Sequence, residues 1–140
     1  MRFLLTLWTA FILLCPLANA KPATLQSLYT NPEGKHLSEA IIFYSSANTC
    51  QNCHKAIDMM IAVLKENYQG KLHAYLIDTA RHPEFISAFH LTGPLNLVII
   101  RISDGAAFGY RKLSGLQSRT GNSKAFTRRI TEFINNFLDF

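Results

Sequence analysis

Two cysteines, Cys50 and Cys53, lie between an apolar run and a helix-like run, and this arrangement constrains the fold more than any other feature of the chain. The preceding run, 40–44 (Ala-Ile-Ile-Phe-Tyr), has the length and continuous apolar character of a strand buried on both faces. From Cys50 to about Tyr68 there is no Pro or Gly, which favours a helix that Asn48 or Thr49 caps. We therefore expect the cysteine pair where a buried strand passes into a helix.

The motif at 50–54, Cys-Gln-Asn-Cys-His, is compatible with more than one chemistry. Two cysteines separated by two residues have the spacing of a redox-active dithiol, whereas Cys-x-x-Cys-His is also the attachment signature of a c-type haem. In a haem protein both cysteines form thioether links and His54 is the axial ligand. In a copper chaperone Cys50, Cys53 and His54 bind a soft ion such as Cu(I). The motif by itself leaves these alternatives open.

The first 20 residues differ in character from the rest of the chain. Met1-Arg2 is followed by an uncharged apolar stretch, 3–17, and then by Ala18-Asn19-Ala20. This pattern is typical of a secretory signal peptide that is cleaved after Ala20. The apolar stretch is shorter than the about 20 residues that a membrane-spanning helix needs. We therefore expect a periplasmic or secreted protein with no membrane attachment after cleavage.

The remaining residues form one lead-in and one domain by this interpretation. The 140 residues, 49% of them hydrophobic, are enough for a single core and too few for two. Residues 21–39 are rich in turn formers and are taken as an N-terminal lead-in, which leaves 40–140 as the domain. Loss of Arg2 lowers the net charge of +5 by one. The remaining basic residues are scattered without interleaved aromatic residues, so we expect no nucleic-acid partner.

The order of elements after the first helix is read from breakers and periodicity. Gly70 ends that helix, and 72–78 is the second strand, which implies a parallel pair joined by a right-handed crossover. Pro83 opens a short helix, 83–90. Its residues expected to face the sheet are Phe85, Ile86 and Phe89. Strands 95–102 and 107–113 follow as a hairpin across Ser103-Asp104-Gly105.

A closing helix completes the order β-α-β-α-β-β-α. Asn122 or Ser123 is its expected cap. Its apolar residues form one stripe at helical spacing: Phe126, Ile130, Phe133, Ile134, Phe137 and Leu138.

This order, with Cys-x-x-Cys after the first strand, resembles the minimal thioredoxin fold over 40–138. The resemblance implies an α/β fold with a central four-stranded mixed sheet and flanking helices. More narrowly, 43–50 (Phe-Tyr-Ser-Ser-Ala-Asn-Thr-Cys), 110–113 (Tyr-Arg-Lys-Leu) and 125–126 (Ala-Phe) are similar to the ArsF-like branch, whose members are labelled nitrophenyl-compound nitroreductase subunits. The stretch 50–55 is also similar to the active site of some periplasmic disulfide isomerases.

The shared implication is thiol-disulfide chemistry. A thiolate at a helix N-terminus is stabilised by unpaired N–H groups and by the helix dipole, so Cys50 is the expected nucleophile and Cys53 the resolving thiol. His54 and Lys55 add positive charge nearby as possible modulators. We expect a protein-disulfide oxidoreductase without a metal or other cofactor, whose partners are clients with thiols or disulfides and an upstream redox protein. A binding module with a purely structural disulfide is the non-enzymatic alternative.

The chain departs from the thioredoxin pattern at two positions. Thioredoxins usually carry a buried carboxylate just before the aromatic pair of the first strand, where this chain has Ile42. They also place a cis-proline beside the dithiol. Pro94 is the nearest candidate here, although an ungapped alignment puts Leu95 at that place. The sequence leaves the isomer of the Gly93-Pro94 bond open.

Overall fold

The computed structural model describes residues 37–48, 50–103 and 106–139, so the predicted signal peptide and residues 21–36 of the lead-in lie outside the described residues. The predicted order β-α-β-α-β-β-α is confirmed, with one added 3-10 helix, η1. No helix in the described ranges is both long and apolar enough to cross a membrane. The elements are β1 (Ser38–Tyr44), α3 (Cys53–Tyr68), β2 (Leu72–Asp78), α4 (Glu84–Ala88), β3 (Leu95–Ser103), β4 (Ala106–Ser114), η1 (Leu116–Arg119) and α5 (Ser123–Leu138).

The four strands form one mixed sheet in the order β2-β1-β3-β4. β1 runs parallel to β2, with Ser38 opposite Leu72 and Tyr44 opposite Asp78, as the intervening helix requires. β1 runs antiparallel to β3, and β3 antiparallel to β4. The C-terminal end of β1 therefore meets the C-terminal end of β2 and the N-terminal end of β3, which brings three loops to one edge of the sheet.

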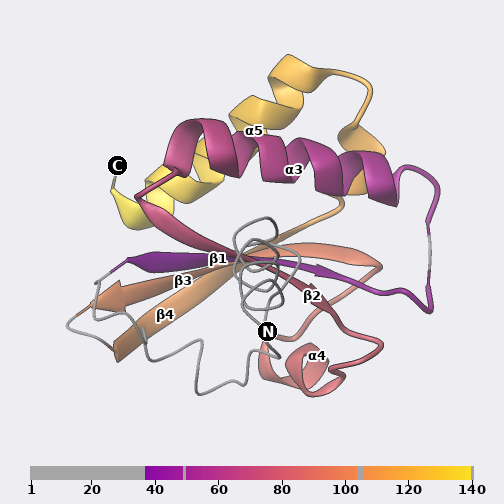
Figure 1. Ribbon diagram of the computed structural model, residues 1–140, viewed down its shortest axis with the longest axis horizontal. Helices are drawn as coiled ribbons and strands as arrows, with labels where there is room; N and C mark the ends of the chain where they lie inside the picture. Colours follow the sequence, from indigo (N-terminus) through magenta and orange to yellow (C-terminus); the bar gives the residue numbers. More distant parts are fainter. Residues whose placement is uncertain (1–36, 49, 104–105, 140) are drawn as a thin grey trace, which may run out of the picture.

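Helices cover both faces of this sheet. α3 and α5 pack on one face, and α4 lies on the other (Figure 1). Alternate residues of β1 enter two separate cores: Ala40 and Ile42 pack toward α3 and α5, whereas Ile41 and Phe43 pack toward α4. β1 is thus buried on both faces, which explains its uninterrupted apolar sequence.

α5 closes the core as its apolar stripe predicts. Phe126, Ile130 and Ile134 are fully buried, and the other three stripe residues pack against the same cluster partly exposed. Asn122 is the N-cap, because its Oδ1 accepts a hydrogen bond from the Ala125 N–H at 3.1 Å.

Sequence-based expectations for β1 and α4 differ from the structure at the ends of these elements. β1 begins at Ser38, two residues before the predicted start. α4 is shorter than predicted, and Ile86 does not face the sheet but is 44% exposed. Phe85 and Phe89 are four residues apart and share the buried face, while Ile86 is turned about 100° away from Phe85 on the helix.

Candidate active site

The cysteine loop, residues 45–52, connects β1 to α3 at the edge where three loops meet. The predicted helix start at Cys50 is wrong, because α3 begins at Cys53. Asn52 has a φ of 71°, and this left-handed conformation cannot continue into a right-handed helix. Asn52 is the N-cap and its side chain makes no capping hydrogen bond, so the predicted cap at Asn48 is also wrong. Thr49 lies outside the described residues.

Cys50 and Cys53 are joined by a disulfide, with their Cα atoms 5.3 Å apart. This separation is within the ordinary range for disulfides. The Cys53 N–H donates to the Cys50 carbonyl oxygen at 3.3 Å, which closes the turn between the two residues. Both cysteines are partly exposed. The structure thus brings together the two residues that the sequence motif singled out, at a position that solvent reaches.

The first turn of α3 surrounds this disulfide with favourable electrostatics for a thiolate. The first helical hydrogen bond of α3 runs from the Ala56 N–H to the Asn52 carbonyl oxygen. The N–H groups before Ala56 therefore have no helical partner four residues back. No acidic residue lies in the first turn. His54 and Lys55 are exposed there, beside Cys53. The Cys50 sulfur, although outside the helix, is held at its positive end by the bond to Cys53.

Pro94 lies at the same edge of the sheet as the cysteine loop. It immediately precedes Leu95, which pairs with Tyr44 at the end of β1. It also lines a cavity of about 130 Å³ together with Ser45 and Asn48 of the cysteine loop. All peptide bonds within the described residues are trans, including Gly93-Pro94.

Asp78 anchors the cysteine loop, a role that the sequence analysis missed. Its Oδ1 accepts hydrogen bonds from the Ser46 N–H at 2.9 Å and the Ala80 N–H at 3.0 Å. Burial raises the pKa of Asp78, but hydrogen bonds from Ser46 and Ala80 and the nearby charge of Arg81 outweigh it, so the pKa lies below its usual value. The available signal was its position as the polar residue that ends the predicted strand 72–78.

The second anchor of this edge is Thr79. Its backbone N–H and its hydroxyl both donate to the carbonyl oxygen of Tyr44, at 2.8 and 3.1 Å. The end of β1 and the start of the cysteine loop are therefore held to the last residue of β2, Asp78, and to the next residue, Thr79.

Glu39 is a buried acid on the wrong face of the sheet to act on the disulfide. Ile42 occupies the position of the thioredoxin carboxylate and packs toward α3. Glu39 shares the opposite face with Ile41, near the end of β1 away from the cysteine loop. Burial raises its pKa to about 8, and an interaction with Tyr75 offsets only part of this rise.

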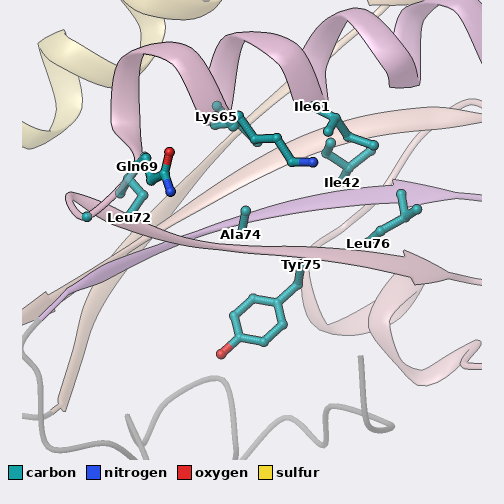
Figure 2. A pocket seen from close by; sticks show the side chains of 10 residues that line it. Ile42, Ile61, Lys65, Gln69, Leu72, Ala74, Tyr75 and Leu76 are labelled. Atoms are coloured by element: carbon teal, nitrogen blue, oxygen red, sulfur yellow. The ribbon is translucent and has the colours of Figure 1, made fainter. Parts of the chain in front are cut away.

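A larger cavity lies away from the disulfide. It measures about 430 Å³ and is lined by apolar residues of β2 and the second half of α3, with Lys65 and Gln69 at the helix side (Figure 2). Since α3 begins at Cys53 and rises about 1.5 Å per residue, Lys65 lies roughly 18 Å along the helix from the cysteine. This cavity is therefore separate from the candidate active site. Within the described ranges, no group of three His, Cys, Asp or Glu side chains is placed to hold a metal ion.

Comparison of the sequence with protein-family models and with curated proteins gives no match. Solved structures do resemble the fold of this chain. The Trx4 domain of ERdj5 matches with a TM-score of 0.56 and 11% identity, over 81% of this chain and 93% of that domain. The thioredoxin Deadhead from Drosophila melanogaster matches with a TM-score of 0.51 and 13% identity, over 71% and 84% of the two chains. A designed protein matches with a TM-score of 0.52 and 14% identity, over 80% and 93%.

These likenesses, at low sequence identity, concern the fold. The chain has a thioredoxin-like α/β fold with a four-stranded mixed sheet, as the sequence analysis expected. It carries a Cys-x-x-Cys disulfide between the first described strand and the helix that follows.

Proposed function

We propose that the protein is a periplasmic or secreted thiol-disulfide oxidoreductase whose Cys50–Cys53 pair cycles between disulfide and dithiol. The observation that carries the proposal is the partly exposed disulfide at the start of α3 in a thioredoxin-like fold. A purely stabilising role explains this disulfide poorly. Disulfides stabilise mainly by closing long loops in the unfolded chain, and this one joins residues only three apart in sequence.

The reductive half of the cycle begins with Cys50 as a thiolate. Its sulfur attacks one sulfur of a client disulfide, so that a Cys50–client disulfide forms, the client disulfide breaks, and the second client sulfur leaves as a thiolate. Cys53 then loses its proton to solvent and attacks the Cys50 sulfur. The Cys50–Cys53 disulfide forms, and the first client sulfur leaves. Two electrons have passed from the protein to the client.

The reverse sequence oxidises a client dithiol and leaves Cys50 and Cys53 reduced. The direction depends on the stability of the Cys50–Cys53 disulfide relative to that of the client. Helix N-terminal N–H groups and the Lys55 charge stabilise a Cys50 thiolate, and stabilisation of the thiolate favours the reduced protein. An upstream redox protein restores the starting form after each turnover.

The alternatives in which Cys50 and Cys53 attach haem or bind copper have less support. In the structure Cys50 and Cys53 are bonded to each other, whereas haem attachment requires a separate thioether bond from each sulfur. The β3–β4 hairpin also belongs to the central sheet, which a small helical haem protein does not require. Copper binding by Cys50, Cys53 and His54 requires the reduced pair. The dithiol–disulfide cycle uses the bond that is present.

Export and family placement complete the proposal. Residues 1–20 act as a signal peptide cleaved after Ala20, which delivers the domain to an oxidising compartment where such a disulfide persists. Residues 43–50 support a place near the ArsF-like branch, and residues 50–55 support one near the periplasmic disulfide isomerases. Mass determination of the mature protein from a periplasmic fraction tests the cleavage, and a mass that retains residues 1–20 contradicts it.

Single cysteine variants test the chemistry. Cys50→Ser should abolish disulfide exchange with a client peptide, because the thiolate that attacks the client is lost and Cys53 acts only as the resolving thiol. Cys53→Ser should instead accumulate a mixed disulfide through Cys50, visible by non-reducing electrophoresis and mass spectrometry. Full activity from either variant would contradict the cycle. A reduction potential of the pair well below about −300 mV would assign the disulfide a structural role. A Soret band in the purified protein would assign the cysteines to haem.

A further inference from the structure

We propose that the 130 Å³ cavity beside the cysteine loop is a subsite for a small, neutral client side chain that bears an amide or hydroxyl donor, and that Asn96 selects it. This inference rests on the proposed function, because the occupant belongs to the client of the redox pair.

The cavity is placed to receive a residue next to the client's reactive cysteine. Ser45 and Asn48 of the cysteine loop line it together with Pro94. Asn48 is two residues before Cys50, and consecutive Cα atoms are about 3.8 Å apart, so these two Cα atoms are separated by at most about 7.6 Å. An extended client chain spans about that distance with two residues. A side chain one or two positions from the client cysteine therefore reaches the cavity.

Asn96 is a buried lining residue of this cavity whose amide oxygen lacks a hydrogen-bond partner. It lies on β3 opposite Phe43 and is 2% exposed. Its Oδ1 has no hydrogen-bond partner in the described part of the chain. Buried side-chain oxygens in native proteins are nearly always paired, so this one calls for an explanation. Rotation about the soft χ2 torsion exchanges the positions of the Asn96 amide oxygen and nitrogen, and with the oxygen on the cavity side a donor from the client satisfies it.

Size and charge define the class of occupant. A volume of about 130 Å³ is below the about 300–1,000 Å³ of sites for whole small molecules, and it corresponds to roughly four water molecules. It suits one side chain. None of the lining residues is charged, so a charged occupant would lose its hydration without a counter-charge. An apolar occupant would leave Asn96 unpaired. Ser, Thr, Asn and Gln remain as the preferred client residues.

Matched peptides test the selection. In each of four pairs of disulfide-linked peptides, Asn or the similarly shaped Leu occupies one position within two residues of the reactive cysteine. The rate constant of exchange with the reduced protein should be about five-fold higher for Asn at one of these positions, as expected for one neutral hydrogen bond. Asn96→Leu should bring that ratio to about one. Asn96→Val is the second variant, because a β-branched residue suits a strand and carries no amide.

Gln117→Leu is the matched control. It removes another buried, unpartnered amide oxygen, but from η1, outside the cavity. The Asn preference should persist in this variant. Equal rates within every peptide pair for the wild-type protein, or a preference that survives both Asn96 variants, would overturn the subsite.

A small disulfide separates failure of the subsite from failure of the proposed function. Exchange with oxidised glutathione requires only the redox pair, so its absence overturns the oxidoreductase proposal. In that event acetamide serves as a direct probe of the cavity. A saturable change of the Asn96 side-chain amide resonances on titration, retained in Gln117→Leu, supports the subsite. No change up to molar acetamide overturns it.

Discussion

Replacement of Glu39 by Gln should make the protein more stable at alkaline pH and leave it nearly unchanged at pH 4. Glu39 is fully buried in β1, opposite His73 of β2, and burial raises its pKa from 4.5 to about 8. Between these two values the folded protein keeps a proton on Glu39 that the unfolded chain releases. The free energy of unfolding therefore falls as pH rises through this range.

The expected magnitude follows from the two pKa values. One pKa unit corresponds to about 1.4 kcal/mol, so the full difference corresponds to about 4–5 kcal/mol. The difference in free energy of unfolding between Glu39→Gln and wild type should grow by up to about 1.4 kcal/mol per pH unit above pH 4.5. This gap should level off above pH 8. Gln keeps the shape and polarity of a protonated Glu without a titratable proton, so other titrating groups contribute equally to both proteins and cancel in the gap.

Urea unfolding of both proteins at intervals from pH 4 to pH 9, with the disulfide kept oxidised, measures this gap. Glu66→Gln is the matched control, because Glu66 is exposed on α3 and its replacement should give no pH-dependent gap of this size. A gap for Glu39→Gln that stays constant across the pH range would refute the reasoning, since it would mean that Glu39 ionises alike in the folded and unfolded states.

Two further predictions concern the cysteine loop. Asp78→Ala should lower the free energy of unfolding at pH 7 by about 2–3 kcal/mol, because a carboxylate that accepts two N–H bonds is lost. The pKa of Asp78 in the folded protein lies below its ordinary value of 3.8. The difference in free energy of unfolding between wild type and Asp78→Ala should therefore shrink as pH falls below 3.8. An equally large difference at pH 2, measured by urea unfolding, would contradict this. Asn52→Val should lower stability by about 1–2 kcal/mol through its left-handed φ, whereas Asn52→Gly should not, and equal thermal shifts for both would refute this cause.

The sequence was sufficient for the order of elements because each one has a strong local signal. The uninterrupted apolar run at 40–44 marks a strand between two cores, and the stripe of α5 marks one buried helix face. The parallel pairing of β1 with β2 followed from the crossover rule, and the four-stranded mixed sheet followed from the thioredoxin resemblance. Signals of this kind depend on periodicity, which a single sequence displays directly.

Boundaries were predicted less well, for physical reasons. The start of α3 is set by the left-handed conformation of Asn52, and Asn also occurs within helices, so its presence alone does not mark an end. The exposure of Ile86 reflects the shortness of α4, which has room for only one buried face. Such details depend on packing against neighbouring elements.

The candidate site was predicted from one local motif and from the thioredoxin resemblance, which pointed to Pro94. Cys50 and Cys53 share one motif, and the structure joins them. Asp78 and Asn96 come from other strands and reach the cysteine loop only through strand pairing, which no local pattern displays. Residues of this kind become visible only when the register of the sheet is known.

The antiparallel pairing of β1 with β3 has a consequence for how the site tolerates change. Tyr44 lies opposite Leu95, and this one register joins the cysteine loop to the loop of Pro94, about fifty positions further along the chain. A slip of one residue between the two strands would turn Asn96 to the opposite face and displace Pro94 by about 3.4 Å. The geometry of the site therefore depends on buried side chains in the middle of the sheet as much as on the cysteines. Loops of varied sequence can be exchanged around the site as long as the register of β1 and β3 is kept.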